Sequence, residues 1–303
     1  MRDSRDIKFV ARTRGRAPFD VDTMVVHNGL KPYEVNVRPE IFCSDEDMRL
    51  YCYDSGGMQT TFKAGALTNA AIMFHYGDVI SFVDDDFGEV SYDHDCLLDF
   101  GSGKHVKIWS NSIPERPKKY LMGYVDFVRM AYEELGASRA VQLGTYGKPT
   151  ECLDMSIFSK GNPTWPYCTQ GFLSKSVIDA FWFTPSILDT KLITKATLPY
   201  VRHEDTYLGL INNCSAIVLP AFIEHIGRRV NLTGMHPVDY IVQMHIEKVR
   251  NGVADPDLEP PRNDAQFWLE ENYHRLCLEC EQIKLRRDKI KFVEAIFFQG
   301  ERI

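Results

Sequence analysis

The chain has 303 residues, a length that fits one elaborated α/β domain or two smaller domains. Hydrophobic residues make up 44% and charged residues 25%, which excludes disordered, collagen-like and disulfide-scaffold proteins. The net charge of -7 leaves no overall positive field for nucleic acid or an anionic membrane, although a local basic groove is compatible with it. Nucleic acid is therefore a disfavoured partner.

The apolar runs predict no transmembrane helix. The longest ones, such as Ala70 to Phe74 and Ser215 to Ile223, are far shorter than the roughly 18 residues that span a bilayer. The N-terminus is charged and is not followed by the apolar stretch of a secretory signal. The eight cysteines are scattered, as expected of reduced thiols. We expect a soluble cytoplasmic protein.

The first third of the chain predicts alternating strands and a helix. A helix is expected over Lys63 to His75, where apolar residues recur at helical spacing, and Gly77 fits its C-cap. Val79 to Val83 is a buried-type strand that runs directly into Asp84-Asp85-Asp86. Three short β-rich runs precede these elements, at residues 7–11, 23–27 and 49–53, each closed by a polar turn.

The remaining two thirds predict further alternation and then helices. A Pro-rich linker at residues 253–261 interrupts the helical part. The expected helices are residues 120–135, 174–183, 208–211, 236–250 and a long amphipathic one at 266–297, and the expected strands are 140–143 and 216–219.

This order of elements predicts an α/β protein with a mostly parallel, Rossmann-like sheet flanked by helices, whose ligands bind at the carboxyl ends of the strands. We expect a main domain over residues 1–233, with a first half at 1–100 and a second at 101–233, and an α-helical appendage over residues 234–303.

The sharpest chemical feature is Asp84-Asp85-Asp86 after the buried strand. Carboxylates spaced i and i+2 at a strand end can hold a hard divalent cation through oxygen, and a solvated acidic turn is the alternative. A second acidic pair, Glu204-Asp205, opens a predicted helix, where the helix N-terminus stabilises a carboxylate. The alternative for this pair is an ordinary first-turn acid.

These segments resemble the nucleotide-sugar region of GT-A-fold glycosyltransferases of family two. The signature helix beginning Lys63-Ala-Gly-Ala-Leu-Thr-Asn69, the pair Gly77-Asp78, the strand and the DxD motif follow in the family's order. The segment from Ile7 to Arg14 resembles its first strand and nucleotide loop. Thr23 to Gly29 resembles its second strand and turn, with His27-Asn28 in place of the usual acids.

Two downstream segments extend the resemblance to about residue 229. His203 to Gly209 resembles the family's Glu-Asp motif, and Leu219 to Arg229 resembles its closing strand with the following His225. The Gln-x-x-Arg-Trp motif of processive polymer synthases is absent from the sequence.

The resemblance implies a metal-dependent inverting glycosyltransferase. Its metal residues would be Asp84, Asp86 and His225, holding Mn²⁺ or Mg²⁺ against the diphosphate, with Asp205 as general base beside Glu204. The implied donor is a nucleotide-diphosphate sugar, with UDP as its expected nucleotide, and the acceptor is a glycan, protein or other hydroxyl-bearing molecule. The residues assigned to donor binding are Thr13, Arg14, His27, Asn28, Asp54, Lys63, Asn69, Asp84, Asp85 and Arg228.

Two other hypotheses remain open. Tyr76 to Val79, Pro166 to Gly171 and Glu204 to Gly209 also resemble motifs of β-1,3-galactosyltransferases of family thirty-one, although no later acidic cluster stands where that family has its DxD motif. The other hypothesis is a catalytically inactive nucleotide-binding or scaffold protein on the same fold, which loss of either acidic motif would favour.

Several residues invite a chemical role but have a simpler explanation. Cys277 and Cys280 have metal-like spacing but lie inside a predicted helix, and we expect core thiols. Asp93-His-Asp95 is expected to be exposed, and Phe181-Trp-Phe183 is expected in the core.

Overall fold

The computed structural model describes residues 6–13, 23–27, 41–43, 64–83, 87–92, 120–135, 140–146, 177–178, 186–197, 208, 211–212, 216–225 and 264–297. The strands are β1 (Ile7–Thr13), β2 (Thr23–His27), β3 (Ile41–Cys43), β4 (Val79–Val83), β5 (Phe87–Tyr92), β6 (Tyr120–Gly123), β7 (Ala140–Tyr146), β8 (Val177–Ile178), β9 (Ser186–Asp189) and β10 (Ala216–His225). The helices are α1 (Ala64–Phe74), α3 (Tyr124–Leu135), α7 (Asp264–Gln282) and α8 (Arg286–Phe297), with a 3-10 turn, η2 (Thr190–Leu192).

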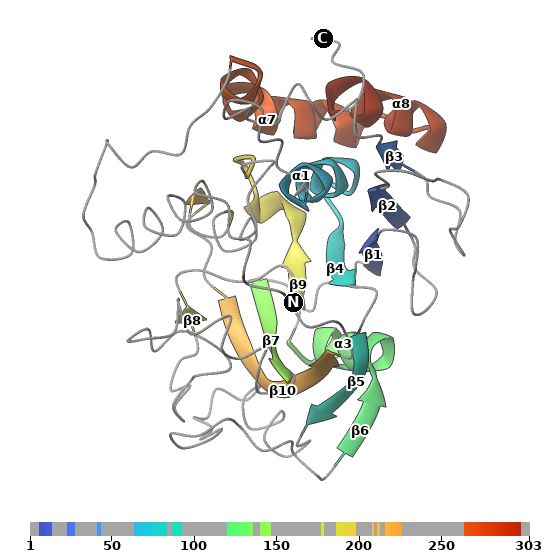
Figure 1. Cartoon of the computed structure of the whole chain (residues 1–303), viewed down its shortest axis with the longest axis vertical. Helices are drawn as coiled ribbons and strands as arrows, with labels where there is room; N and C mark the ends of the chain where they lie inside the picture. The colour runs from blue at the N-terminus through green and yellow to red at the C-terminus, as the bar shows by residue number, and fades with distance from the viewer. Residues whose placement is uncertain are drawn as a thin grey trace, which may run out of the picture.

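The described strands join in one mixed sheet of order β3-β2-β1-β4-β9-β7-β10-β5-β6, with β8 beside β10 (Figure 1). Strands β3, β2, β1 and β4 are parallel to one another, as are β7 and β10. Strand β9 is antiparallel to both of its neighbours, and β5 and β6 are antiparallel to the strands they pair with. The described sheet is therefore mixed, with parallel pairing confined to these two groups of strands.

The strand order of the sheet reverses at β1. The chain adds β2 and β3 on one side of β1, then crosses through α1 to place β4 on the other side. A reversal of this kind opens a crevice at the carboxyl ends of the two central strands. Those ends are Thr13 and Val83, and the register brings them together because Ala11 pairs with Val83.

Strand β4 and residues 9–11 of β1 are buried on both faces, which explains why β4 is apolar except for Ser81. Val10 and Phe82 belong to the core that contains α1, whereas the alternate residues Phe9 and Ser81 meet α3. The hydroxyl of Tyr124 on α3 lies 2.7 Å from Ser81 Oγ and donates to the Phe82 carbonyl oxygen at 3.1 Å. Helices α1 and α3 therefore cover opposite faces of the sheet.

Helix α1 is buried between the sheet and the pair α7 and α8 (Figure 1). All of residues 65–76 are buried, which fits a helix that is apolar on every side. Leu276 and Cys277 of α7 and Phe297 of α8 share one hydrophobic core with α1. The two C-terminal helices therefore form a third layer of that core instead of a core of their own.

A tight turn joins α1 to β4. Gly77 has φ of 95°, a left-handed conformation that glycine adopts most easily, and this confirms the predicted helix C-cap. Thr190 holds the turn because its Oγ1 accepts the Gly77 N–H at 2.9 Å and lies 2.8 Å from the Asp78 carbonyl oxygen. The turn and η2 are thereby fixed to each other.

Several predicted elements are confirmed by the structure, with small changes of boundary. The predictions that match described elements are the strands at 7–11, 23–27, 79–83, 140–143 and 216–219 and the helix at 63–75. Leu208 and Ile211 are helical, as predicted. The predicted strand at 49–53 and the predicted helix at 236–250 lie outside the described residues.

Three helix predictions are wrong in part. Residues 120–123 form β6, so that helix begins at Tyr124, and Val177–Ile178 form β8 inside the region predicted as helix 174–183. The single helix predicted over 266–297 is two helices, separated at residues 283–285. The break lets both helices bury apolar residues against α1, which one straight rod of that length could not do. No helix within the described residues is long and apolar enough to cross a bilayer.

Candidate functional site

The ends of β1, β2 and β4 lie side by side at the carboxyl edge of the sheet. Thr13 of β1 pairs with Val26, the residue before His27, and Ala11 pairs with Val83. The sequence predicts donor-binding residues at these ends, and the backbone at Thr13 and His27 is at this edge. Arg14 and Asp84 are the next residues along the chain after β1 and β4.

Another predicted residue, His225, comes from a much later segment and lies at the carboxyl edge of the sheet, on a strand three positions from β4 in the strand order. His225 ends β10 and pairs with Phe87, the first residue of β5. Phe87 follows Asp86 directly in the sequence, and the three acidic residues connect β4 to β5. The register shifts between Ile223 and His225, so a bulge in β10 immediately precedes this pairing.

The structure describes only part of the predicted site. For Thr13, His27 and His225 the structure describes the strand backbone alone. The predicted residues that lie outside the described part of the chain are Arg14, Asn28, Asp54, Lys63, Asp84, Asp85, Asp86, Glu204, Asp205 and Arg228. The segments Asp93-His-Asp95 and Phe181-Trp-Phe183 also lie outside it.

Asn69, predicted to contact the donor, is fully buried on α1. Its amide nitrogen donates to the Thr197 carbonyl oxygen at 2.8 Å, and its amide oxygen accepts from the Thr197 N–H at 2.9 Å. The Tyr273 hydroxyl donates to the Asn69 carbonyl oxygen at 2.9 Å. In this structure Asn69 ties α1 to the segment after η2 and to α7.

The segment that follows the predicted general base is anchored in the core. Leu208, three residues after Asp205, is fully buried in the cluster around α1. Asn212 accepts from the backbone N–H groups of Thr194 and Lys195, both at 2.8 Å, and donates to the Leu208 carbonyl oxygen at 2.9 Å. These contacts fix Leu208 and Asn212 against the core and the segment after η2.

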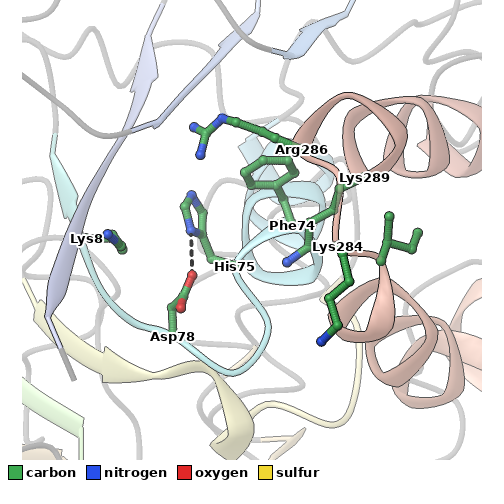
Figure 2. Close-up of a pocket in the computed structure, with 8 residues that line it drawn as sticks. Lys8, Phe74, His75, Asp78, Lys284, Arg286 and Lys289 are labelled. Carbon is green, nitrogen blue, oxygen red and sulfur yellow. Dashed lines mark hydrogen bonds and ion pairs between the residues drawn. The ribbon is translucent and has the colours of Figure 1, made fainter. Parts of the chain in front are cut away.

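A cavity of about 260 Å³ opens at the opposite, amino edge of β1 and β4 (Figure 2). His75 Nδ1 lies 3.2 Å from Asp78 Oδ2 at its wall, and His75 is 3% exposed. The residues that line it are Lys8, Phe74, His75, Asp78, Ile283, Lys284, Arg286 and Lys289.

Burial and hydrogen bonding act differently on the pKa values of this pair. Burial lowers the pKa of His75, and the nearby Lys289 and Arg286 cations lower it further, against the raising effect of Asp78. Burial alone would raise the pKa of Asp78, but the hydrogen bond from His75 and the charges of Lys289 and Lys8 outweigh it and lower that pKa. The imidazole is therefore neutral and the carboxylate ionised near neutral pH.

Sequence analysis missed this cavity because its walls come from three separate segments. One signal was present in the sequence: four cations within residues 284–289 at a helix start. The sequence motifs included Asp78, as part of the Gly77-Asp78 pair, but did not predict its contact with His75.

The described residues contain no group of three or more His, Cys, Asp or Glu side chains that could hold a metal ion. Cys277 and Cys280 are both free and buried, which confirms the expected core thiols. Burial raises the pKa of Cys277 well above its usual range and that of Cys280 to about 12, so both remain protonated and unreactive.

Comparison of the sequence with protein-family models and with curated proteins finds no match.

Proposed function

We propose that the protein is a metal-dependent inverting glycosyltransferase that moves a sugar from a nucleotide-diphosphate sugar to an acceptor hydroxyl. The observation that carries the proposal is the convergence of predicted site segments on one edge of the sheet. β1, β2 and β4 end there, and β10 brings His225 beside the residue that follows Asp86. The sequence motifs supply the reaction class, and the strand order supports a common site for them.

The crossing point of the sheet supports a nucleotide site between β1 and β4. Open α/β sheets bind ligands at the carboxyl ends of the strands where the strand order reverses, and here those strands end at Thr13 and Val83. In the proposal, Thr13 at the end of β1 and Arg14 after it lie beside the nucleotide. Arg228 contributes a guanidinium group whose planar fork matches phosphate oxygens.

The residues predicted to hold a divalent cation suit such an ion by their chemistry. Carboxylate oxygens from Asp84 and Asp86 are the ligands that Mg²⁺ and Mn²⁺ prefer, and the imidazole of His225 is a nitrogen ligand that Mn²⁺ accepts. The pairing of His225 with Phe87 supports their grouping. When bound, such a cation would neutralise negative charge on the leaving diphosphate.

The remaining chemistry in the proposal belongs to Asp205. Its carboxylate accepts the proton of the acceptor hydroxyl while that oxygen attacks the anomeric carbon, the bond to the leaving phosphate oxygen breaks, and the configuration inverts. The preceding Glu204 lies in the same acidic pair.

The test is nucleotide binding by the full chain. UDP, GDP, CDP and dTDP are each added with Mn²⁺, Mg²⁺ or EDTA, and the shift in Tm is measured. We expect one nucleotide to raise Tm only with metal, since a ligand that binds the folded state stabilises it by mass action. Asp86→Asn should lose that shift, and Glu271→Gln, an exposed carboxyl change on α7, should retain it.

Three outcomes would contradict the proposal. If no nucleotide shifts Tm under any condition, the inactive scaffold becomes the better hypothesis. An equal Tm shift for the wild type and Asp86→Asn with metal would instead show that the acidic motif is not part of the nucleotide site. A sugar nucleotide that binds with metal but is neither hydrolysed nor transferred to any acceptor would favour an inactive nucleotide-binding protein.

A further inference from the structure

The cavity at the amino edge of the sheet is separate from the proposed donor site. Lys8 lies near the start of β1, and Asp78 directly precedes β4. The predicted donor residues follow the opposite ends of these strands. Strand geometry puts Asp78 and Val83 roughly 17 Å apart, so one small ligand cannot occupy both places.

The cavity has an excess of positive charge. Among its described lining residues, four are cationic and one is a carboxylate, Asp78. Arg286 Cζ lies 5.3 Å and Lys289 Nζ 5.4 Å from the centre of the Phe74 ring, which holds both cations at the cavity wall. Asp78 is directed toward His75 in Figure 2, so its negative charge is taken up by the hydrogen bond with His75.

His75 supplies a buried polar atom with no partner. Its Nδ1 faces Asp78, and a neutral imidazole that donates from Nδ1 keeps a lone pair on Nε2. Nε2 is buried and has no hydrogen-bond partner among the residues that the structure describes. In Figure 2 this nitrogen is turned away from Asp78, toward the side from which the Arg286 guanidinium extends. Buried polar groups without partners are rare and call for an explanation.

We propose that this cavity is a phosphate-binding site, with Arg286 and Lys289 contacting the anionic oxygens, Lys284 adding positive charge at the cavity wall, and His75 Nε2 accepting a hydrogen bond from a phosphate hydroxyl. Guanidinium and ammonium groups are the usual ligands of phosphate. Hydrogen phosphate and protonated phosphate monoesters carry both anionic oxygens and one hydroxyl, which matches cations grouped beside a lone imidazole acceptor.

The size of the cavity admits more than a bare ion. About 260 Å³ is close to the lower range of small-molecule pockets, so the phosphate group of a small monoester fits as well as inorganic phosphate. Both ligands carry a phosphate group with at least one free hydroxyl, and the experiment distinguishes inorganic phosphate from a phosphate monoester.

The test is isothermal titration calorimetry on the full chain, with EDTA present so that metal-dependent donor binding does not contribute. Inorganic phosphate, glucose 6-phosphate and sulfate are titrated at constant ionic strength and a pH near 6.5. We expect saturable binding of one phosphate ligand per chain, and tighter binding of glucose 6-phosphate would identify a monoester as the source. Sulfate should bind at least about tenfold more weakly, because it carries no hydroxyl for His75 at this pH.

Matched variants locate the binding. Arg286→Gln should weaken phosphate binding about tenfold through loss of a charge-assisted contact, and Lys284→Gln should weaken it by a smaller factor through loss of a nearby positive charge. The control is Arg287→Gln, which removes a cation from the same helix turn. The Arg287 side chain is 78% exposed and is not among the lining residues, so binding should be unchanged. Lys284 is itself exposed, so its variant should fold even if replacement of Arg286 disturbs α8.

Three results would overturn the inference: no saturable binding of either phosphate ligand, equal weakening by Arg287→Gln and Arg286→Gln, or sulfate binding as tightly as phosphate. The proposed function fails independently of this result. Phosphate binding that survives Asp86→Asn while nucleotide binding is absent would leave this site standing and remove the glycosyltransferase. Nucleotide binding without phosphate binding would support the glycosyltransferase proposal and remove this phosphate site.

Discussion

His225, the last residue of β10, pairs with Phe87, the first residue of β5. The pair joins positions 138 residues apart in the sequence. It puts the backbone of a predicted metal ligand beside the residue that follows the acidic segment Asp84-Asp85-Asp86. The order of motifs along the chain could not show this relationship, because it depends on an antiparallel pairing across the sheet.

Replacement of His225 tests that relationship. His225→Ala should raise the Mn²⁺ concentration needed for half of the nucleotide-dependent Tm shift by about tenfold, since one nitrogen ligand is lost. His274→Ala is the control, because His274 is exposed on α7, far along the chain from the acidic segment. The same Mn²⁺ requirement in the wild type and His225→Ala would exclude His225 from the metal site.

Replacement of Asp205 separates catalysis from donor binding. Asp205→Asn should lower kcat by about 10²- to 10⁴-fold, because a general base acts only on the proton transferred in the transition state. Metal-dependent nucleotide affinity should not change. Steady-state kinetics and calorimetric titration of the same sample provide both numbers. A variant that loses affinity for the nucleotide but retains kcat would assign Asp205 to donor binding instead.

The contribution of α7 to the core is measurable with two leucines of one helix. Leu276 is fully buried in the cluster with α1, whereas Leu278 is 44% exposed. Leu276→Ala should lower the free energy of unfolding by about 2 to 5 kcal/mol, because it removes buried methyl groups and leaves a cavity. Leu278→Ala should change it by less than about 0.5 kcal/mol. Urea denaturation measures both, and equal effects would show that α7 does not pack as described.

Gly77 tests the turn between α1 and β4. An added Cβ would lie 2.6 Å from Glu281 Oε1, and φ of 95° is unfavourable for alanine. Gly77→Ala should lower the free energy of unfolding by more than about 1 kcal/mol. The double variant Gly77→Ala with Glu281→Ala relieves the contact but not the backbone strain, so it should recover part of the loss. A neutral single variant would contradict the left-handed turn.

His75 predicts a dependence of stability on pH. Its folded pKa lies below the ordinary value of 6.5, so the unfolded chain binds a proton on this imidazole at a higher pH than the folded chain does. The free energy of unfolding should therefore fall as pH drops from about 6.5 toward the folded pKa. The charged groups that act on the ring are Asp78, Lys289 and Arg286, with Lys8 and Lys284 lining the same cavity, and the lowered pKa of Asp78 keeps it ionised over this range.

Measurement of Tm between about pH 5 and 8 tests this dependence. His75→Gln removes the titrating ring and should flatten the curve over the lower half of that range. Leu278→Ala, an exposed change of a side chain that does not titrate, should leave the shape of the curve as in the wild type. An unchanged slope in His75→Gln would show that this ring is not buried neutral.

The sequence by itself determined those features whose cause is local. The helix at 64–74 follows from residues of high helix propensity at helical spacing, β4 from a short run that is apolar except for Ser81, and the left-handed turn from Gly77. The buried thiols of Cys277 and Cys280 follow from their place on the apolar side of a helix. Each depends on neighbours within a few residues, which the sequence displays directly.

Only the tertiary structure decided the features whose cause lies in distant residues. The break between α7 and α8 occurs where both must pack on α1, and the fully buried Asn69 is held by Thr197 and Tyr273, far along the chain. The phosphate cavity needs Lys8, His75 and Arg286 from three segments. Such arrangements are set by the packing of a shared core and by strand pairing across the sheet, and neither leaves a period or motif in the sequence.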